Sequence, residues 1–134
     1  MSVVARQNPE VALANCGASD GVGSLVYVKG AAVGGKYSVE TADPSDFGKM
    51  PAIGMIIQKP TATECFVQFR GQVSGVYAGL TPGELLFVDD SGLLAADPPD
   101  PEAGTPKFMQ NVGVSLADGV IELSPNRVMA KRRL

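Results

Sequence analysis

The chain contains no histidine and no tryptophan among its 134 residues. Histidine titrates near neutral pH and is the commonest protein ligand for metals, so its absence removes the first candidate residue of most hydrolase and zinc chemistries. No G-x-S-x-G segment is present either, and a serine nucleophile without histidine would need a lysine as its base. We therefore expect no catalytic residues, no metal ligands, no cofactor and no enzymatic activity.

Cysteine is nearly absent. Cys16 and Cys65 are the two cysteines; they stand 49 positions apart and form no C-x-x-C pair. This spacing indicates neither a disulfide framework nor a metal knuckle. It favours two buried thiols in a protein made in a reducing compartment.

Long apolar runs and fields of one charge are also missing. No stretch approaches the ~20 apolar residues of a membrane span, and the opening segment MSVVARQNPEVALANCG lacks the apolar region of a signal peptide. Eleven basic and fourteen acidic residues give a net charge of -3, with no basic field for a polyanion. We expect synthesis in the cytoplasm, no membrane contact and no direct contact with nucleic acid.

Turn residues are abundant: the chain has 16 glycines and 10 prolines spread along its length. From residue 23 onward, short runs rich in valine, isoleucine, tyrosine and phenylalanine alternate with turn pairs such as Gly34-Gly35, Pro82-Gly83 and Ser91-Gly92. This alternation predicts an all-β domain. Residues 97–106 hold four prolines and several charges, which predicts an exposed loop.

The chain repeats part of its own pattern. GSLVYV at 23–28 matches GELLFV at 83–88 with an offset of 60, and MPAIGMII at 50–57 matches MQNVGVSL at 109–116 with an offset of 59. We infer two related β units, about 23–70 and 83–123, that complete one small barrel or sandwich with a pseudo-two-fold over residues 23–128. Gly54 and Gly113 each stand between aliphatic residues, which predicts a bend or a close backbone approach.

Residues 1–22 differ from the rest and predict an extended N-terminal arm. Their few apolar residues are interrupted by Asn8-Pro9 and by Gly17 and Gly21. So sparse a segment buries too little apolar surface to offset its ordering entropy, so we expect it to fold on a partner by strand addition. The candidate partner-binding residues are Val3, Val4, Arg6, Val11 and Leu13.

The C-terminal residues 129–134 form a short basic tail, for which the sequence allows a solvated end or contact with an acidic partner surface.

The paired carboxylates and the phenylalanines are better explained by structural roles than by a functional site. Asp43 with Asp46, and Asp89 with Asp90, are paired carboxylates in turn-like segments, without the ligand spacing of a calcium loop. Four phenylalanines fall in predicted strands as core candidates, namely Phe66, Phe69, Phe87 and Phe108.

Together, the segments GLTPGELLFV at 79–88, QNVGVSL at 110–116 and DGVIEL at 118–123 resemble bacteriophage capsid decoration proteins, also called cement or head-stabilising proteins. The resemblance covers about residues 23–128. It implies a homotrimer on the outer surface of the virion, bound to the major capsid protein, with its arm extended over a neighbouring subunit. It also implies stabilisation of the shell by bridging adjacent capsid subunits.

The sequence also allows two other functions. A receptor- or carbohydrate-binding module of a phage tail fibre would need Tyr27, Tyr37 or Tyr77 exposed together beside polar groups. A small β-barrel enzyme would compare with the trimeric deoxyuridine triphosphatases, but the chain lacks matches to their glycine-rich phosphate and uracil-loop motifs.

Overall fold

The computed structural model describes residues 10–133. Short strands dominate it, with a single turn of 3-10 helix (η1, Phe47–Lys49) in the part of the chain described. The predicted all-β class is confirmed. The strands are Glu10–Asn15 (β1), Leu25–Val28 (β2), Val39–Thr41 (β3), Gly54–Thr61 (β4), Glu64–Ser74 (β5), Leu85–Val88 (β6), Leu94–Ala95 (β7), Lys107–Met109 (β8), Asn111–Ala117 (β9), Val120–Leu123 (β10) and Ala130–Arg132 (β11).

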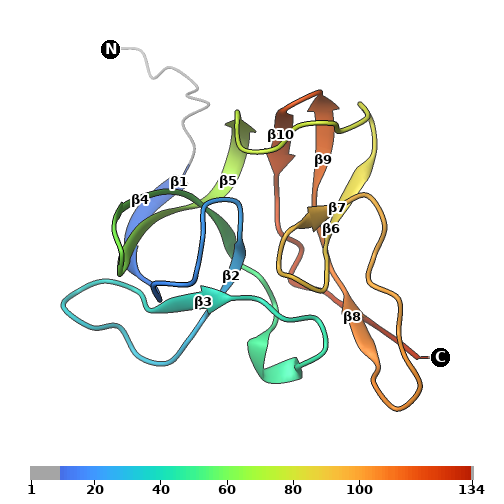
Figure 1. Ribbon diagram of the computed structural model, residues 1–134, viewed down its shortest axis with the longest axis horizontal. Helices are drawn as coiled ribbons and strands as arrows, with labels where there is room; N and C mark the ends of the chain where they lie inside the picture. The colour runs from blue at the N-terminus through green and yellow to red at the C-terminus, as the bar shows by residue number, and fades with distance from the viewer. Residues whose placement is uncertain (1–9, 134) are drawn as a thin grey trace, which may run out of the picture.

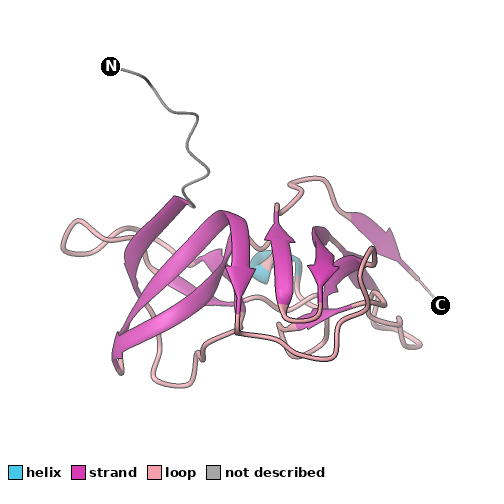
Figure 2. Cartoon of the chain, turned by 90° about the horizontal axis from the view of Figure 1, so that it is seen from above, coloured by secondary structure: helices cyan, strands magenta, loops and turns pink. Residues whose placement is uncertain are grey.

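The main sheet has a symmetrical strand order. It runs β3-β2-β4-β5-β10-β9-β6-β7, so the first unit (β2 to β5) and the second unit (β6, β7, β9 and β10) meet where β5 pairs antiparallel with β10. At that junction Val73 lies opposite Ile121. Figures 1 and 2 show the two units side by side, with long curved strands in the first.

The strand register confirms the two related units. Val26 on β2 lies opposite Gly54 on β4, and Leu86 on β6 lies opposite Gly113 on β9. The glycine before each strand donates the matching hydrogen bond: the Gly23 amide to the Ile56 carbonyl at 2.8 Å and the Gly83 amide to the Ser115 carbonyl at 2.7 Å.

Both repeated glycines mark close backbone approaches, as the sequence predicted. A Cβ placed on Gly54 would lie 2.6 Å from the carbonyl oxygen of Gln68, and one on Gly113 would collide with the carbonyl oxygen of Glu122. Neither position has room for a side chain, because the backbone of the neighbouring strand lies directly against each glycine.

Two hydrophobic cores result from this curling. The first lies inside the first unit and comprises Ala14, Val26, Val39, Ile56, Cys65 and Val67. The second is shared, because Leu25 and Met55 from the first unit pack with Leu86, Val88, Ile121 and Leu123 of the second. The first unit is thus a curled half-barrel whose outer face completes the core of the second unit.

The predicted arm over residues 1–22 requires a correction. Residues 1–9, with Val3, Val4 and Arg6, lie outside the described residues. Glu10–Asn15 instead form β1 and pair antiparallel with β5 of the same chain, with Ala14 fully buried opposite Cys65. Beyond β1, the carboxylate of the buried Asp20 accepts hydrogen bonds from the Gly17 and Thr41 amides. The long strand β5 offers an edge within the same chain, so residues 10–15 pair with β5 and do not extend away from the domain.

The predicted basic tail is also partly structured. Within 129–134, Ala130–Arg132 form β11 and pair antiparallel with β8. The Lys131 ammonium lies 5.8 Å from the centre of the Phe108 ring, and the Arg132 guanidinium donates to the carbonyl of Pro99 at 3.0 Å. Two of the tail's cations therefore contact their own domain.

The predicted loop at 97–106 contains no named strand, although Pro99 is buried within it. The four phenylalanines do lie on strands, but each is half-buried rather than enclosed. Phe69 packs against the first core and Phe108 against the shared core. Phe69 and Phe108 cover these cores from outside, because the interior positions are filled mainly by aliphatic side chains.

Candidate functional site

An open groove runs beside β1 at the mouth of the first unit. It has a volume of about 760 Å³, within the usual range for ligand sites. We call it the β1 groove. Its apolar lining consists of Val11, Ala12, Val28, Tyr37, Ala52, Ile53, Phe69 and Pro125.

Three large apolar side chains of this groove are accessible to solvent. Val11, Val28 and Tyr37 are 41%, 48% and 54% exposed. The Tyr37 ring meets Phe69 edge to face, with 6.2 Å between ring centres, which fixes the orientation of that wall. Exposed apolar surface gathered in one concavity is typical of a binding surface rather than of a solvated face.

The groove exists because β1 is paired along one edge alone. β5 occupies that edge, and on the other side the described residues make a single isolated bridge, between Asn15 and Ser38. The Asn15 side-chain amide donates to the Val33 carbonyl at 3.0 Å and so holds the loop before β3 in place. Along this edge, residues 10–14 pair with no other strand in the described part of the chain, and Glu10, Val11 and Ala12 line the groove.

The charges at the rim are mainly positive. Arg70 and Arg127 line the groove together with Glu10. The Arg70 guanidinium lies 3.7 Å from the Glu10 carboxylate, and both side chains are more than 60% exposed. Arg127 has no ion pair in the described part of the chain. The rim therefore holds two guanidinium groups against one carboxylate.

Of the predicted site residues that the structure describes, one lines the β1 groove and the other does not. Val11 lines the groove, Leu13 is half-buried on the same strand outside the lining, and Val3, Val4 and Arg6 are not described. Sequence reasoning missed Val28 and Ile53. It named Tyr37 only for the carbohydrate-binding alternative and Phe69 only as a core candidate, and all four come from distant segments. No pattern in the sequence signals their convergence, because it depends on how the sheet curls.

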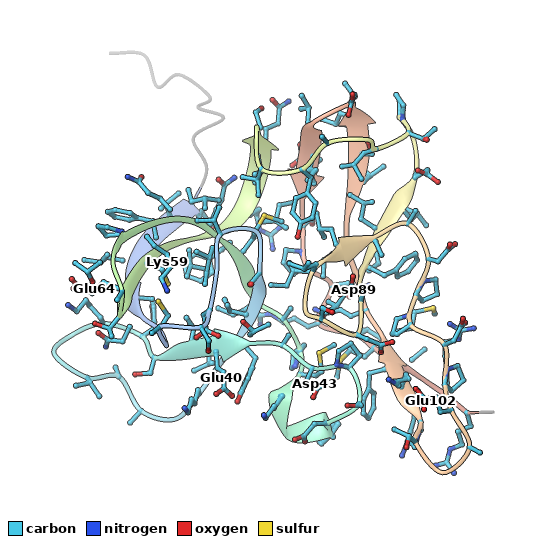
Figure 3. The ribbon with its side chains drawn as sticks, in the orientation of Figure 1. Glu40, Asp43, Lys59, Glu64, Asp89 and Glu102 are labelled. Atoms are coloured by element: carbon cyan, nitrogen blue, oxygen red, sulfur yellow. The ribbon has the colours of Figure 1, made fainter. Side chains whose placement is uncertain are left out.

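Asp43, Asp46 and Asp89 serve turns, whereas Asp90 accepts a hydrogen bond from the Lys107 ammonium. Asp89 accepts hydrogen bonds from the Ser91 and Leu93 amides at 2.8 and 2.9 Å in the turn between β6 and β7, as the sequence indicated (Figure 3). Asp46 caps η1 by accepting from the Gly48 amide. Burial acts to raise the pKa of Asp43, but the hydrogen bonds from Ser45 outweigh it and the pKa is lowered.

The two cysteines, distant in sequence, lie near each other. Cys65 is fully buried, Cys16 is half-buried against the same core, and both are free thiols. Burial raises the pKa of the Cys65 thiol to about 12, and the neighbouring Cys16 thiol adds to the shift. Cys65 is therefore an unreactive core thiol at neutral pH.

The three tyrosines do not share one exposed surface. Tyr27 is 8% exposed and donates a hydrogen bond to Glu40; burial raises its pKa to about 12, with that hydrogen bond contributing. Tyr77 is half-buried, and its hydroxyl donates to the Gly23 carbonyl. Tyr37 alone of the three projects into an open surface, the β1 groove.

Residues 10–133 bring together no group of three or more histidine, cysteine, aspartate or glutamate side chains suited to a metal ion. Within the same range, no helix has the length and hydropathy needed to cross a membrane.

Comparison of the chain with protein-family models, with curated proteins and with solved structures finds no match.

Proposed function

We propose that this chain is a structural protein of a bacteriophage virion that binds the outside of the capsid as a homotrimer and clamps adjacent major capsid protein subunits. The observation that carries the proposal is the β1 groove, an apolar docking surface beside an open strand edge. Surfaces of this kind bind protein segments through main-chain hydrogen bonds and side-chain pockets.

The scaffold behind the groove suits a clamp. The two units share one core, so neither moves without disturbing the other. A rigid body with a binding surface transmits load between the subunits that it touches. Many copies on one shell then raise the cost of separating any two subunits, through avidity rather than through one strong contact.

The first nine residues join the fold at Glu10, which lines the groove. In the sequence, Val3, Val4 and Arg6 stand a few positions before Glu10, and under the proposal they add to the contact with the capsid. Leu13, by contrast, is committed to the sheet and serves the fold.

The test uses capsid shells assembled without this protein. We expect the full chain to sediment with the shells and to raise their rupture temperature, and deletion of residues 1–9 to weaken shell binding by about tenfold or more. Val22→Asp, at an exposed position outside the groove lining, is the matched control and should bind normally. Sedimentation equilibrium should give the mass of three chains. Failure of the full chain to bind shells overturns the proposal.

A further inference from the structure

We propose that the open edge of β1 accepts an extended segment of the partner protein as an added strand, and that this segment carries apolar side chains together with an acidic one. The inference deepens the proposed function and rests on it for the identity of the partner, the major capsid protein. The strand edge, the apolar lining and the charge of the rim support it independently.

The backbone of β1 supplies the first argument. The Asn15 amide donates away from β5, to the Tyr37 carbonyl at 2.7 Å, whereas the Cys16 amide donates toward β5, to the Thr63 carbonyl at 2.9 Å. Amide direction alternates along a strand, so the Leu13 and Val11 amides point to the same side as that of Asn15. A strand laid along this edge would continue the ladder that Asn15 begins.

The lining supplies the second argument. Alternate side chains of an added strand point to the same face, where Val28, Tyr37 and Phe69 present apolar surface. Burial of that surface favours valine-like or isoleucine-like residues at every second position of the incoming segment.

The charge of the rim supplies the third argument, and it distinguishes a segment of another protein from the termini of this chain. Arg70 and Arg127 outnumber Glu10, so an acidic side chain on the incoming strand meets complementary charge. The chain's own termini do not fit this rim. Residues 1–9 carry Arg6 as their single charged side chain, and the charged side chains of residues 129–134 are all basic. The occupant is therefore a segment of a different protein.

The experiment uses the full chain and two sets of nine-residue peptides with valine or isoleucine at alternate positions. One set carries aspartate or glutamate between them, and the other carries lysine. Fluorescence anisotropy should show about tenfold tighter binding of the acidic set, with binding weakened by salt. The double variant Arg70→Glu/Arg127→Glu should reverse the preference, whereas Lys131→Glu, a surface cation outside the groove lining, should keep it.

N-methylation of the peptide tests strand addition itself. Methyl groups on the alternate amides that face β1 should abolish binding, while methyl groups on the other amides should leave it unchanged. Equal effects of the two series, an absent acidic preference, or a preference unmoved by the double arginine variant overturns the inference.

Shell binding separates this inference from the proposed function. If the double arginine variant and Val11→Asp bind shells as the unmodified chain does, the groove inference fails while the clamp stands. If acidic peptides bind but shells do not, the proposed function fails and the strand-accepting edge stands. Phe47→Ser, an exposed apolar position outside the groove lining, serves as the control for loss of apolar surface.

Discussion

The side chain of Gln110 forms paired hydrogen bonds with the backbone of Ala52, 58 positions earlier in the chain. Its carbonyl oxygen accepts from the Ala52 amide and its amide nitrogen donates to the Ala52 carbonyl, both at 2.8 Å. The same nitrogen donates to the Asn126 carbonyl at 2.9 Å. Gln110 is fully buried, so one side chain satisfies backbone groups from two segments that are far apart in the sequence.

Gln110→Ala should therefore destabilise the fold strongly. The substitution leaves the amide and carbonyl of Ala52 buried without partners, and we expect a loss of about 2–4 kcal/mol in the free energy of unfolding. Urea denaturation measures it. Gln58→Ala, at an exposed glutamine on β4, is the matched control and should change the midpoint little. Equal midpoints for the two variants would contradict the role assigned to Gln110.

The repeated glycines should resist substitution in both units. Gly54→Ala and Gly113→Ala each place a methyl group against a neighbouring carbonyl oxygen, so we expect a loss of about 1–3 kcal/mol for each. Gly21→Ala, where a Cβ meets nothing within 4 Å, should be close to neutral. Thermal melting of the three variants checks the prediction, and a near-neutral Gly113→Ala would show that the second unit curls less tightly.

Cys65 should withstand alkylation in the folded chain. Its pKa is raised to about 12, so the reactive thiolate is scarce at pH 8. In a Cys16→Ser chain, iodoacetamide should modify Cys65 only after unfolding, as mass spectrometry of the intact protein would reveal. Rapid modification under native conditions would mean that this part of the core opens.

The same shift has a consequence for stability at alkaline pH. The folded pKa lies above the ordinary value of 9.0, so the protonated thiol stabilises the fold below about pH 9 and this contribution is lost as pH rises toward 12. Urea midpoints between pH 8 and 11 should fall more steeply for the unmodified chain than for Cys65→Ala. If the urea midpoints of the two chains fall equally with pH, ionisation of Cys65 does not affect the stability of the fold.

Lys107 depends on Asp90 as its counter-ion. Its ammonium lies 2.7 Å from the Asp90 carboxylate, and the lysine side chain is 8% exposed against 59% for the aspartate. The hydrogen bond to Asp90 raises the pKa of Lys107, outweighing the opposite effect of burial. Asp90→Asn should cost about 1 kcal/mol, because it leaves a buried cation unpaired.

A double variant checks this account of Lys107. Lys107→Met/Asp90→Asn should be more stable than Asp90→Asn alone, since no unpaired charge remains. The stabilisation that Asp90 gives through the raised pKa of Lys107 should hold below about pH 10.5 and decline above it. An additive double-variant cycle would show that the two groups do not interact.

The sequence by itself determined the β class, the two units and the places where the chain turns. These features are local: glycine punctuates the strands, apolar residues alternate along them, and the same short pattern occurs twice. The glycines at 54 and 113 were recognisable because a missing side chain has a meaning within its own strand. The turn role of Asp89 was readable for the same reason.

The tertiary structure alone decided which distant segments meet. β1 joins the sheet because the edge of β5 is free beside it, and no property of residues 10–15 reveals that edge in advance. Cys16 approaches Cys65, Gln110 reaches Ala52, and four separate segments bring Val11, Val28, Tyr37 and Phe69 to one groove. Local sequence determines which side chains of a strand point to the same face. The curvature and register of the assembled sheet determine which residues become neighbours, and both arise from packing of the whole chain.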